Sequence, residues 1–406
     1  MTDSAPSSFP STRDEALRRL DAFTTRIAAY SATRNRVVPG HANVSRLSPA
    51  VRHRLVLEQE LVEHAIRACG PRACEKFVQE VTWRTYWKGW LEHRPDVWRD
   101  HRRRARRLRA DGDPTMLRRA QAVARGESGV AVMDAFAKEL LETGFLHNHA
   151  RMWWASFWIH VERLPWDLGA DHFLRHLLDA DPASNTLSWR WVAGLHTKGK
   201  HYLVRRSNIE DHLDPTLLGN GTGLERLEDD AVTPASIVDE ADLARRVLPE
   251  HGVAPMPRGK RVGVWLHDDD LLAEVGGLAT LDAVAIAGWI ESDDASSLRQ
   301  SHRERALRDG LDRAGSHWRR PVAGGTAVSS IAGAMEAWVA AEGLDEVIAH
   351  APFVGPVHDA FDEIAAAARR AGASITLLRR EWDAAMFPAA KAGFFPFWER
   401  ARRLLS

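Results

Sequence analysis

The chain has 406 residues, of which 45% are hydrophobic and 27% are charged, so it can bury a sizeable core and form two domains. Equal numbers of basic and acidic side chains give it a formal net charge of zero. Residues 1–12 lack the layout of a signal peptide, no apolar run reaches the roughly 18 residues of a membrane span, and two cysteines cannot build a disulfide framework. We therefore expect a globular, cytoplasmic monomer that does not contact a membrane.

The N-terminal part is expected to form a helix over residues 14–30, because Leu17, Leu20, Phe23 and Ile27 fall on one stripe at helical spacing. A polar turn follows this helix.

A short motif, Ser45-Arg-Leu-Ser-Pro49, comes next. Ser48 is suited to cap a helix, and Pro49 is suited to its first turn. The free N–H groups of a helix start, together with Arg46, favour a phosphate group. Taken alone the signal is weak, since most capped helix starts bind nothing.

A helix over residues 71–93 carries an unusual face. Residues three and four apart share one face of a helix, and here that face combines an acid, a guanidinium and aromatic rings: Phe77, Glu80, Trp83, Arg84 and Trp87. The pattern favours a binding face, and the alternative is a surface pair of Arg84 and Glu80 beside core aromatics.

Residues 94–125 form an arginine-rich run. A one-sided basic surface attracts a polyanion, whereas the alternative is a solvated helix face. Both interpretations stay open at this point.

Residues 144–191 combine dense indoles with interleaved amides and charges: Trp153, Trp154, Trp158, Trp166, Trp189 and Trp191 with Asn148, Arg151, Asp179, Asp181 and Asn185. Buried polar groups require hydrogen-bond partners, so the pattern suggests a flat, polar cofactor. Asp181 precedes Pro182 and is expected to cap a helix, whereas Asp179 has no such role. We expect no metal, because the pair His172 and His176 lacks the glutamate of the metalloprotease motif.

The remainder is expected to contain a connector, residues 207–258, with one helix near 239–248. Beyond it, predicted strands at 262–266, 283–287, 346–349 and 374–378 alternate with predicted helices at 297–314, 329–341 and 358–371. Strands separated by helices imply a parallel sheet. No glycine-rich dinucleotide fingerprint is present, so a nicotinamide cofactor is not expected.

Four motifs in the same order resemble the FAD-binding helical domain of the photolyase/cryptochrome family: Ser45-Arg-Leu-Ser-Pro49 with Tyr30 upstream, Glu80-x-x-Trp83-Arg84, Gly144-Phe-Leu-His147-Asn148-x-x-Arg151-Met152, and Leu178-Asp179-Ala-Asp181-x-x-x-Asn185-x-x-x-Trp189-x-Trp191. The resemblance implies a multidomain α and α/β fold. An all-helical FAD-binding domain (1–206) and a connector (207–258) would precede a Rossmann-like parallel α/β domain (259–406). Typical members place the antenna domain first, so we hypothesise a circular permutation.

The resemblance also implies roles for individual residues. The FAD contacts would be Tyr30, Ser45, Arg46, Leu47, Ser48, Phe77, Glu80, Arg84, Asn148, Arg151, Asp179, Asp181 and Asn185. The contacts to a flipped-out pyrimidine dimer would be Trp83, Asn148, Met152 and Trp191. The catalytic group would be Glu80, Asn185, Trp166 and Trp189, the two tryptophans forming part of an electron relay.

The activity implied is light-driven repair of cyclobutane pyrimidine dimers in DNA, including single-stranded DNA, by excited reduced FAD. An antenna pigment would be an additional cofactor, which the sequence does not identify. The third tryptophan of the family's relay is replaced by Asp113 and its neighbours. Either Trp98, Trp158 or another indole would complete the relay, or photoreduction of the flavin would be weak. An alternative to the repair enzyme is a cryptochrome-type photoreceptor that binds FAD and signals to a protein partner without repair. The missing third tryptophan favours this alternative.

Overall fold

The computed structural model describes residues 9–196, 201–229, 232–238 and 243–405. Its contacts divide the chain into two compact units. The first unit contains Met1–Thr25, Leu47–His93 and Arg245–Ser406, and the second contains Arg26–Arg46 and Arg94–Ala244. The sequence analysis instead places domain boundaries at residues 206 and 258, and these stay a prediction. Each unit is described by itself.

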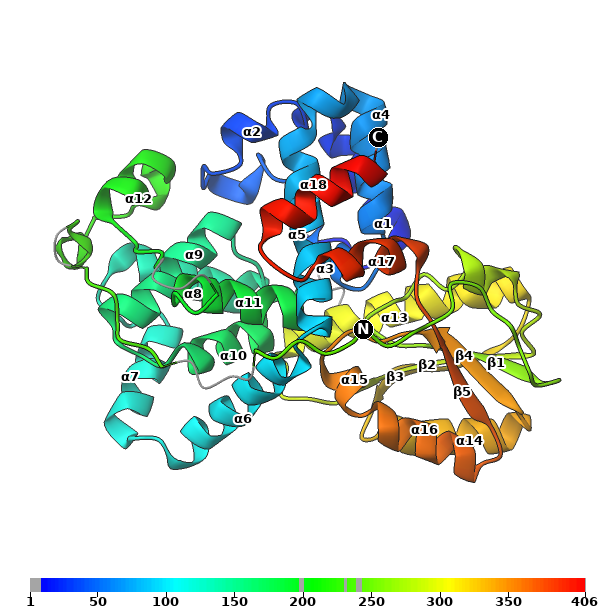
Figure 1. Cartoon of the computed structure of the whole chain (residues 1–406). Helices are drawn as coiled ribbons and strands as arrows, with labels where there is room; N and C mark the ends of the chain where they lie inside the picture. The colour runs from blue at the N-terminus through cyan, green and yellow to red at the C-terminus, as the bar shows by residue number, and fades with distance from the viewer. Residues whose placement is uncertain (1–8, 197–200, 230–231, 239–242, 406) are drawn as a thin grey trace, which may run out of the picture. The chain divides into compact units, whose positions relative to one another are not determined.

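The second unit is helical (Figure 1). Its helices are α2 (Tyr30–Thr33), α6 (Pro95–Asp111), α7 (Pro114–Ala124), α8 (Ala131–Thr143), α9 (Asn148–Ser156), α10 (Trp166–His176), α11 (Pro182–Val192) and α12 (Arg206–His212), and a π-helical turn, Phe157–Val161, extends α9. Gly144 ends α8 in the left-handed conformation, with φ 69°. Asp181 caps α11, as predicted, by accepting a hydrogen bond from the backbone N–H of Ser184 at 2.7 Å.

Indole rings fill the core of the second unit. Trp153, Trp154 and Trp158 are each at most 1% exposed. The rings of Trp154 and Trp158 lie 5.1 Å apart, and Trp154 also stacks on Phe173. The density of tryptophans in residues 144–191 is therefore explained in large part by packing.

The α/β part of the first unit is a five-stranded sheet in the order β3-β2-β1-β4-β5, and every pair is parallel. Its strands are β1 (Val262–Leu266), β2 (Ala285–Glu291), β3 (Val322–Val328), β4 (Glu346–His350) and β5 (Ser374–Leu378). Helix α13 (Ser297–Trp318) covers one face, and α14 (Ile331–Glu342) and α16 (Phe361–Arg370) cover the other (Figure 1). A short helix, α15 (Pro356–Asp359), precedes α16. The predicted fold class, helical with a parallel α/β part, is confirmed.

The remaining helices of the first unit are α1 (Arg13–Phe23), α3 (Ser48–Arg52), α4 (Glu58–Ala73), α5 (Glu75–Glu92), α17 (Glu381–Met386) and α18 (Phe394–Leu404). Two predictions are wrong here. The first helix ends at Phe23 and does not continue to residue 30. The cap of α3 is Leu47, not Ser48, and no side chain caps this helix. Helices α17 and α18 both pack on α5.

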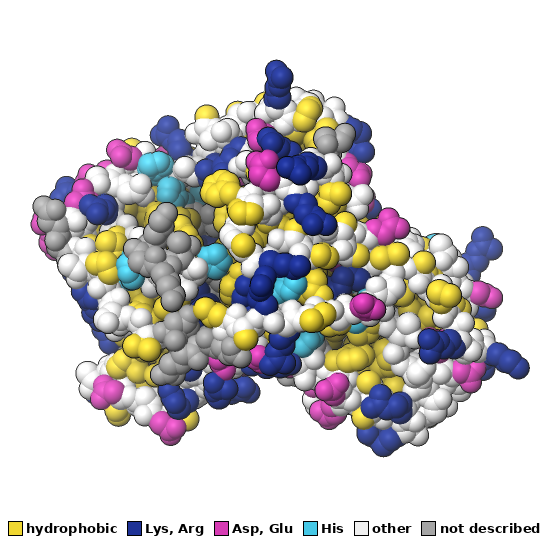
Figure 2. Space-filling model, in the orientation of Figure 1, with side chains coloured by type: hydrophobic (Ala, Val, Ile, Leu, Met, Phe, Trp, Pro, Cys, Tyr) yellow, Lys and Arg dark blue, Asp and Glu magenta, His cyan; other side chains and the backbone are white. Residues whose placement is uncertain are grey.

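The connector also differs from expectation. Residues 243–248 form no helix, and residues 239–242 of the predicted helix lie outside the described part of the chain. No helix among the described residues is long and apolar enough to cross a membrane. On the face shown in Figure 2, basic and acidic side chains are interspersed, in line with the zero net charge.

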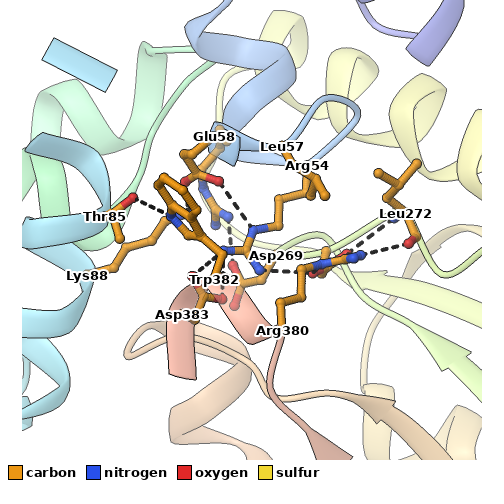
Figure 3. Close-up of polar contacts among 12 residues, drawn as sticks. Arg54, Leu57, Glu58, Thr85, Lys88, Asp269, Leu272, Arg380, Trp382 and Asp383 are labelled. Carbon is orange, nitrogen blue, oxygen red and sulfur yellow. Dashed lines mark hydrogen bonds and ion pairs between the residues drawn. The ribbon is translucent and has the colours of Figure 1, made fainter. Parts of the chain in front are cut away.

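A buried network of charges joins the sheet of the first unit to its helices (Figure 3). Arg54 lies at its centre and donates to Asp383 at 2.7 Å and to Asp270, which follows β1, at 3.1 Å. Arg380 donates to Asp270 at 2.6 Å, and Lys88 of α5 donates to Glu58 of α4 at 2.9 Å. Because removal of one partner leaves a buried charge uncompensated, such networks are sensitive to substitution.

The same edge of the sheet carries further pairs. Arg52 donates to Asp269 at 2.7 Å, and Arg303 of α13 donates to Asp268 at 2.9 Å. Ligands of open α/β sheets bind beyond the carboxyl ends of the strands, where the strand order reverses. In this chain the acids that follow β1 are held at that place by arginines of its own unit.

Candidate functional site

The candidate residues are distributed over both compact units. Leu47, Ser48, Phe77, Glu80, Trp83 and Arg84 belong to the first unit. The second unit holds Tyr30, Ser45, Arg46, Asn148, Arg151, Met152, Trp166, Asp179, Asp181, Asn185, Trp189 and Trp191.

A basic segment of the second unit precedes α3 in the chain. Arg46 has φ 53°, and its pKa is lowered by burial and by the nearby cation Arg26. Among the described residues, no acidic side chain forms an ion pair with Arg46. Two guanidinium groups close together without an acid favour an anion. Arg26 was missed by the sequence analysis because it belongs to no motif, and only the fold brings it near Arg46.

Arg151 and Asp179 form an ion pair in the second unit. Nη2 of Arg151, in α9, lies 3.0 Å from Oδ2 of Asp179, in the loop before α11. The Nε–H of Arg151 donates to the carbonyl of Leu146 at 2.9 Å, and the guanidinium lies 5.5 Å from the centre of the Phe145 ring. Because Asp179 is 5% exposed and Arg151 is held by three groups, the pair has a fixed position.

The positive charge at the start of α9 comes from Arg151 and not from His147. His147 caps α9 by accepting a hydrogen bond from the backbone N–H of His149. Burial, followed by the nearby His41, lowers the pKa of His147 to about 3. His147 is therefore neutral at pH 7.

Asn185 has a defined orientation. Its side-chain N–H₂ donates to the carbonyl of Ala170, in α10, at 2.8 Å. This bond assigns Oδ1 as the acceptor that the amide presents to other groups.

The predicted dimer contacts of the second unit lie in two places. Asn148 and Met152, one turn apart on α9, are brought together, with the amide nitrogen 3.8 Å from the sulfur. The ring of Trp191 lies 5.5 Å from that of Tyr202.

The two predicted relay tryptophans have different neighbours. The ring of Trp189 lies 6.2 Å from Trp154, and a Cβ at Gly169 would come within 2.3 Å of it. Trp166 stacks on His101 at 5.0 Å.

Trp98 and Trp158 both stay candidates for the third relay member. The ring of Trp98 lies 6.1 Å from His101, and that of Trp158 lies 5.1 Å from Trp154. Asp113 caps α7 by accepting from the backbone N–H of Met116 at 2.8 Å, which gives this position a structural role.

Much of the arginine-rich run is paired within its own unit. Arg102 and Arg109 of α6 pair with Asp171 of α10, and Arg104 pairs with Asp167 at 3.2 Å. These arginines stabilise the contact between α6 and α10. A polyanion-binding surface would have to use the exposed remainder of the run, which includes Arg106 and Arg107.

In the first unit, α5 presents the predicted aromatic and acidic face. Oε1 of Glu80 pairs with Lys76 at 3.0 Å, and Phe77 is buried with its ring 6.0 Å from Phe23. Trp83 stacks on Phe394 of α18, with ring centres 3.7 Å apart and an angle of 8° between the planes. The contact of Phe394 with Trp83 could not be predicted from residue spacing, because the two residues are far apart in the sequence.

Known proteins resemble this region. Residues 77–215 match the family described as the FAD binding domain of DNA photolyase. A deoxyribodipyrimidine photo-lyase of Streptomyces griseus is 40% identical over 154 residues, which is 38% of this chain and 32% of the relative. One of Alkalihalophilus pseudofirmus is 33% identical over 192 residues, 47% of this chain and 39% of the relative. The chain thus spans well under half the length of these relatives.

A solved structure of a bacterial class III photolyase from Agrobacterium tumefaciens is 27% identical, with a TM-score of 0.42, and the alignment covers 50% of this chain and 42% of that one. The family match covers the motifs from Glu80 to Trp191. Residues 77–215 are thus similar to the FAD-binding domain of DNA photolyase.

Proposed function

We propose that the chain is a light-driven flavoprotein that splits cyclobutane pyrimidine dimers in DNA. The proposal is supported most by the match of residues 77–215 to the photolyase FAD-binding domain and by relatives named deoxyribodipyrimidine photo-lyase. Repair of single-stranded as well as duplex DNA is part of the proposal.

The side chains fit a flavin dinucleotide. Arg46, with Arg26 beside it, would neutralise the negative charge of the diphosphate. The ion pair of Arg151 and Asp179 would lie against the ring system, and Oδ1 of Asn185 would accept from the N–H at N5 of the reduced ring. Nine other predicted contacts stay part of the proposal: Tyr30, Ser45, Leu47, Ser48, Phe77, Glu80, Arg84, Asn148 and Asp181.

Bound FAD, once reduced and excited by light, would supply the electron that opens the cyclobutane ring and would take it back afterwards. The protein would hold the flipped-out dimer between aromatic and soft apolar groups, since an extruded base requires stacking surfaces. These groups are Trp83, Met152 and Trp191, with Asn148 as a hydrogen-bond donor. Glu80 would form a hydrogen bond with the developing radical anion.

We expect Arg46→Met to raise the dissociation constant of FAD about 10- to 150-fold, because a hydrogen bond to a charged group contributes about 1.5–3 kcal/mol. Titration of the apoprotein with FAD, followed by flavin fluorescence, measures this. Arg36→Met, which removes an exposed arginine of the same segment, is the matched control and should bind FAD like the wild type. Equal affinities for the two variants would remove Arg46 from the diphosphate site.

We expect Glu80→Ala to lower the number of dimers repaired per absorbed photon several-fold while FAD stays bound. The physical reason is the loss of the hydrogen bond that Glu80 would form with the radical anion. The measurement is repair of an oligonucleotide with one thymine dimer under blue light. The control is Glu75→Ala, an exposed acid near the start of the same helix. An unchanged yield in Glu80→Ala would contradict the role of Glu80.

A further inference from the structure

The C-terminal helix α18 is anchored on the helix that carries Trp83. Its residues Phe394, Phe397, Trp398 and Ala401 recur at helical spacing and are all buried. Phe394 stacks on Trp83, and the hydroxyl of Tyr86, also in α5, donates to the carbonyl of Ala392 at 2.6 Å. The position of α18 relative to Trp83 is therefore fixed by packing and by a hydrogen bond.

The other side of α18 is exposed and basic. Phe395 is 72% exposed, and no other phenylalanine, tyrosine or tryptophan among the described residues is classed as exposed. Three arginines of the helix, Arg400, Arg402 and Arg403, are exposed, whereas Glu399 is its one acid. In Figure 2, dark blue basic side chains and yellow hydrophobic side chains appear together where Figure 1 places α18.

We propose that α18 binds the DNA strand that carries the lesion, with its arginines on the phosphates and Phe395 under an unpaired base next to the dimer. This inference rests on the proposed function, in which Trp83 contacts the extruded dimer. Cations interleaved with an exposed aromatic ring fit single-stranded nucleic acid, because every base has a face on which a ring can stack. The stack of Phe394 on Trp83 places α18 directly beside the predicted dimer contact.

Charge complementarity would also fit an anionic membrane surface, but the apolar face argues against it. Helices that lie on membranes insert an apolar face into the lipid. In α18 that face is already buried in its own unit by Phe394, Phe397 and Trp398. Phe395 and Leu404 are the large apolar side chains of α18 that remain exposed.

The test uses the full chain with FAD bound, in the dark, and a fluorescent single-stranded oligonucleotide with one thymine dimer. We expect Phe395→Ala to raise the dissociation constant at least about 5-fold, the lower end of what loss of one base stack causes. Phe395→Tyr keeps the ring and should bind like the wild type. Arg400→Gln with Arg403→Gln should lower the slope of log affinity against log salt by about 1.4, roughly 0.7 for each lost phosphate contact.

The matched control removes two exposed arginines from the end of another helix of the same unit, Arg369→Gln with Arg370→Gln in α16, and should leave the affinity unchanged. Wild-type affinity in the α18 variants, with intact flavin spectra and circular dichroism, would overturn the inference and leave the proposed function standing. Absence of any DNA binding by the wild type would overturn both. Loss of binding to phosphatidylserine vesicles without loss of DNA binding would assign α18 to a membrane and also overturn the inference.

Discussion

Arg54→Met is expected to lower the free energy of unfolding by about 3–5 kcal/mol, the cost of leaving buried acids without their cation. Arg54 is 2% exposed and pairs with three carboxylates, those of Glu58, Asp270 and Asp383. Methionine fills a similar volume, so most of the loss is electrostatic. Urea unfolding followed by circular dichroism measures the difference at pH 7.

The same substitution has a predicted pH dependence. Burial would raise the pKa of Glu58, but Lys88 and Arg54 outweigh it and hold the pKa at about 2. The stability that this depressed pKa contributes is complete above the unfolded value, about 4.5, and is lost as the pH falls through about 2. The difference between wild type and Arg54→Met should therefore shrink between pH 4.5 and 2.

A surface pair is the control for Arg54. Arg18 pairs with Asp14 on α1, where both side chains are more than half exposed. Because exposed pairs contribute little, Arg18→Met should change the free energy of unfolding by less than about 1 kcal/mol. If Arg54→Met were no more destabilising than Arg18→Met, the network would not be what holds the helices of this unit to its sheet.

Asp179→Ala is expected to cost the protein its flavin. The substitution leaves the guanidinium of Arg151 with the carbonyl of Leu146 and the ring of Phe145 but without its counter-charge. Loss of a hydrogen bond between charged groups corresponds to about 10- to 150-fold in affinity. Purified Asp179→Ala should therefore show a much lower ratio of yellow flavin absorbance to protein absorbance.

Two further variants sharpen this result. Asp179→Asn keeps a hydrogen-bond acceptor without the charge and should retain more flavin than Asp179→Ala. Asp211→Ala removes an exposed acid of the same unit and should retain flavin fully. Full flavin occupancy in Asp179→Ala would show that the pair of Arg151 and Asp179 does not hold the cofactor.

Most elements could be predicted where local sequence and burial agree. Strands β1 and β5 have the predicted limits because their apolar runs are rich in β-branched residues and are bounded by polar turns. Strand β3 was missed because Gly324 and Gly325 occupy its middle, and glycine is a poor strand former. The burial of the three aspartates after β1, residues 268–270, could not be predicted from the sequence. Their arginine partners come from distant parts of the chain.

In the candidate site, too, contacts between residues close in sequence could be predicted, whereas contacts between distant residues could not. Asn148 and Met152 could be placed together because their spacing on one helix decides it. The assignment of Asp179 to Arg151 needed the family resemblance. Arg26 and Phe394 could be found only in the fold, since each acts through a residue distant in sequence.

The central proposal is tested most directly by exposing an oligonucleotide with one thymine dimer to the wild-type protein with reduced FAD, in blue light and in the dark. We predict that the dimer is split in the light, restoring the absorbance of the two thymines, and that it stays intact in the dark. A protein that binds FAD and responds to light but leaves the dimer unsplit would contradict the repair function and would favour a photoreceptor with a protein partner.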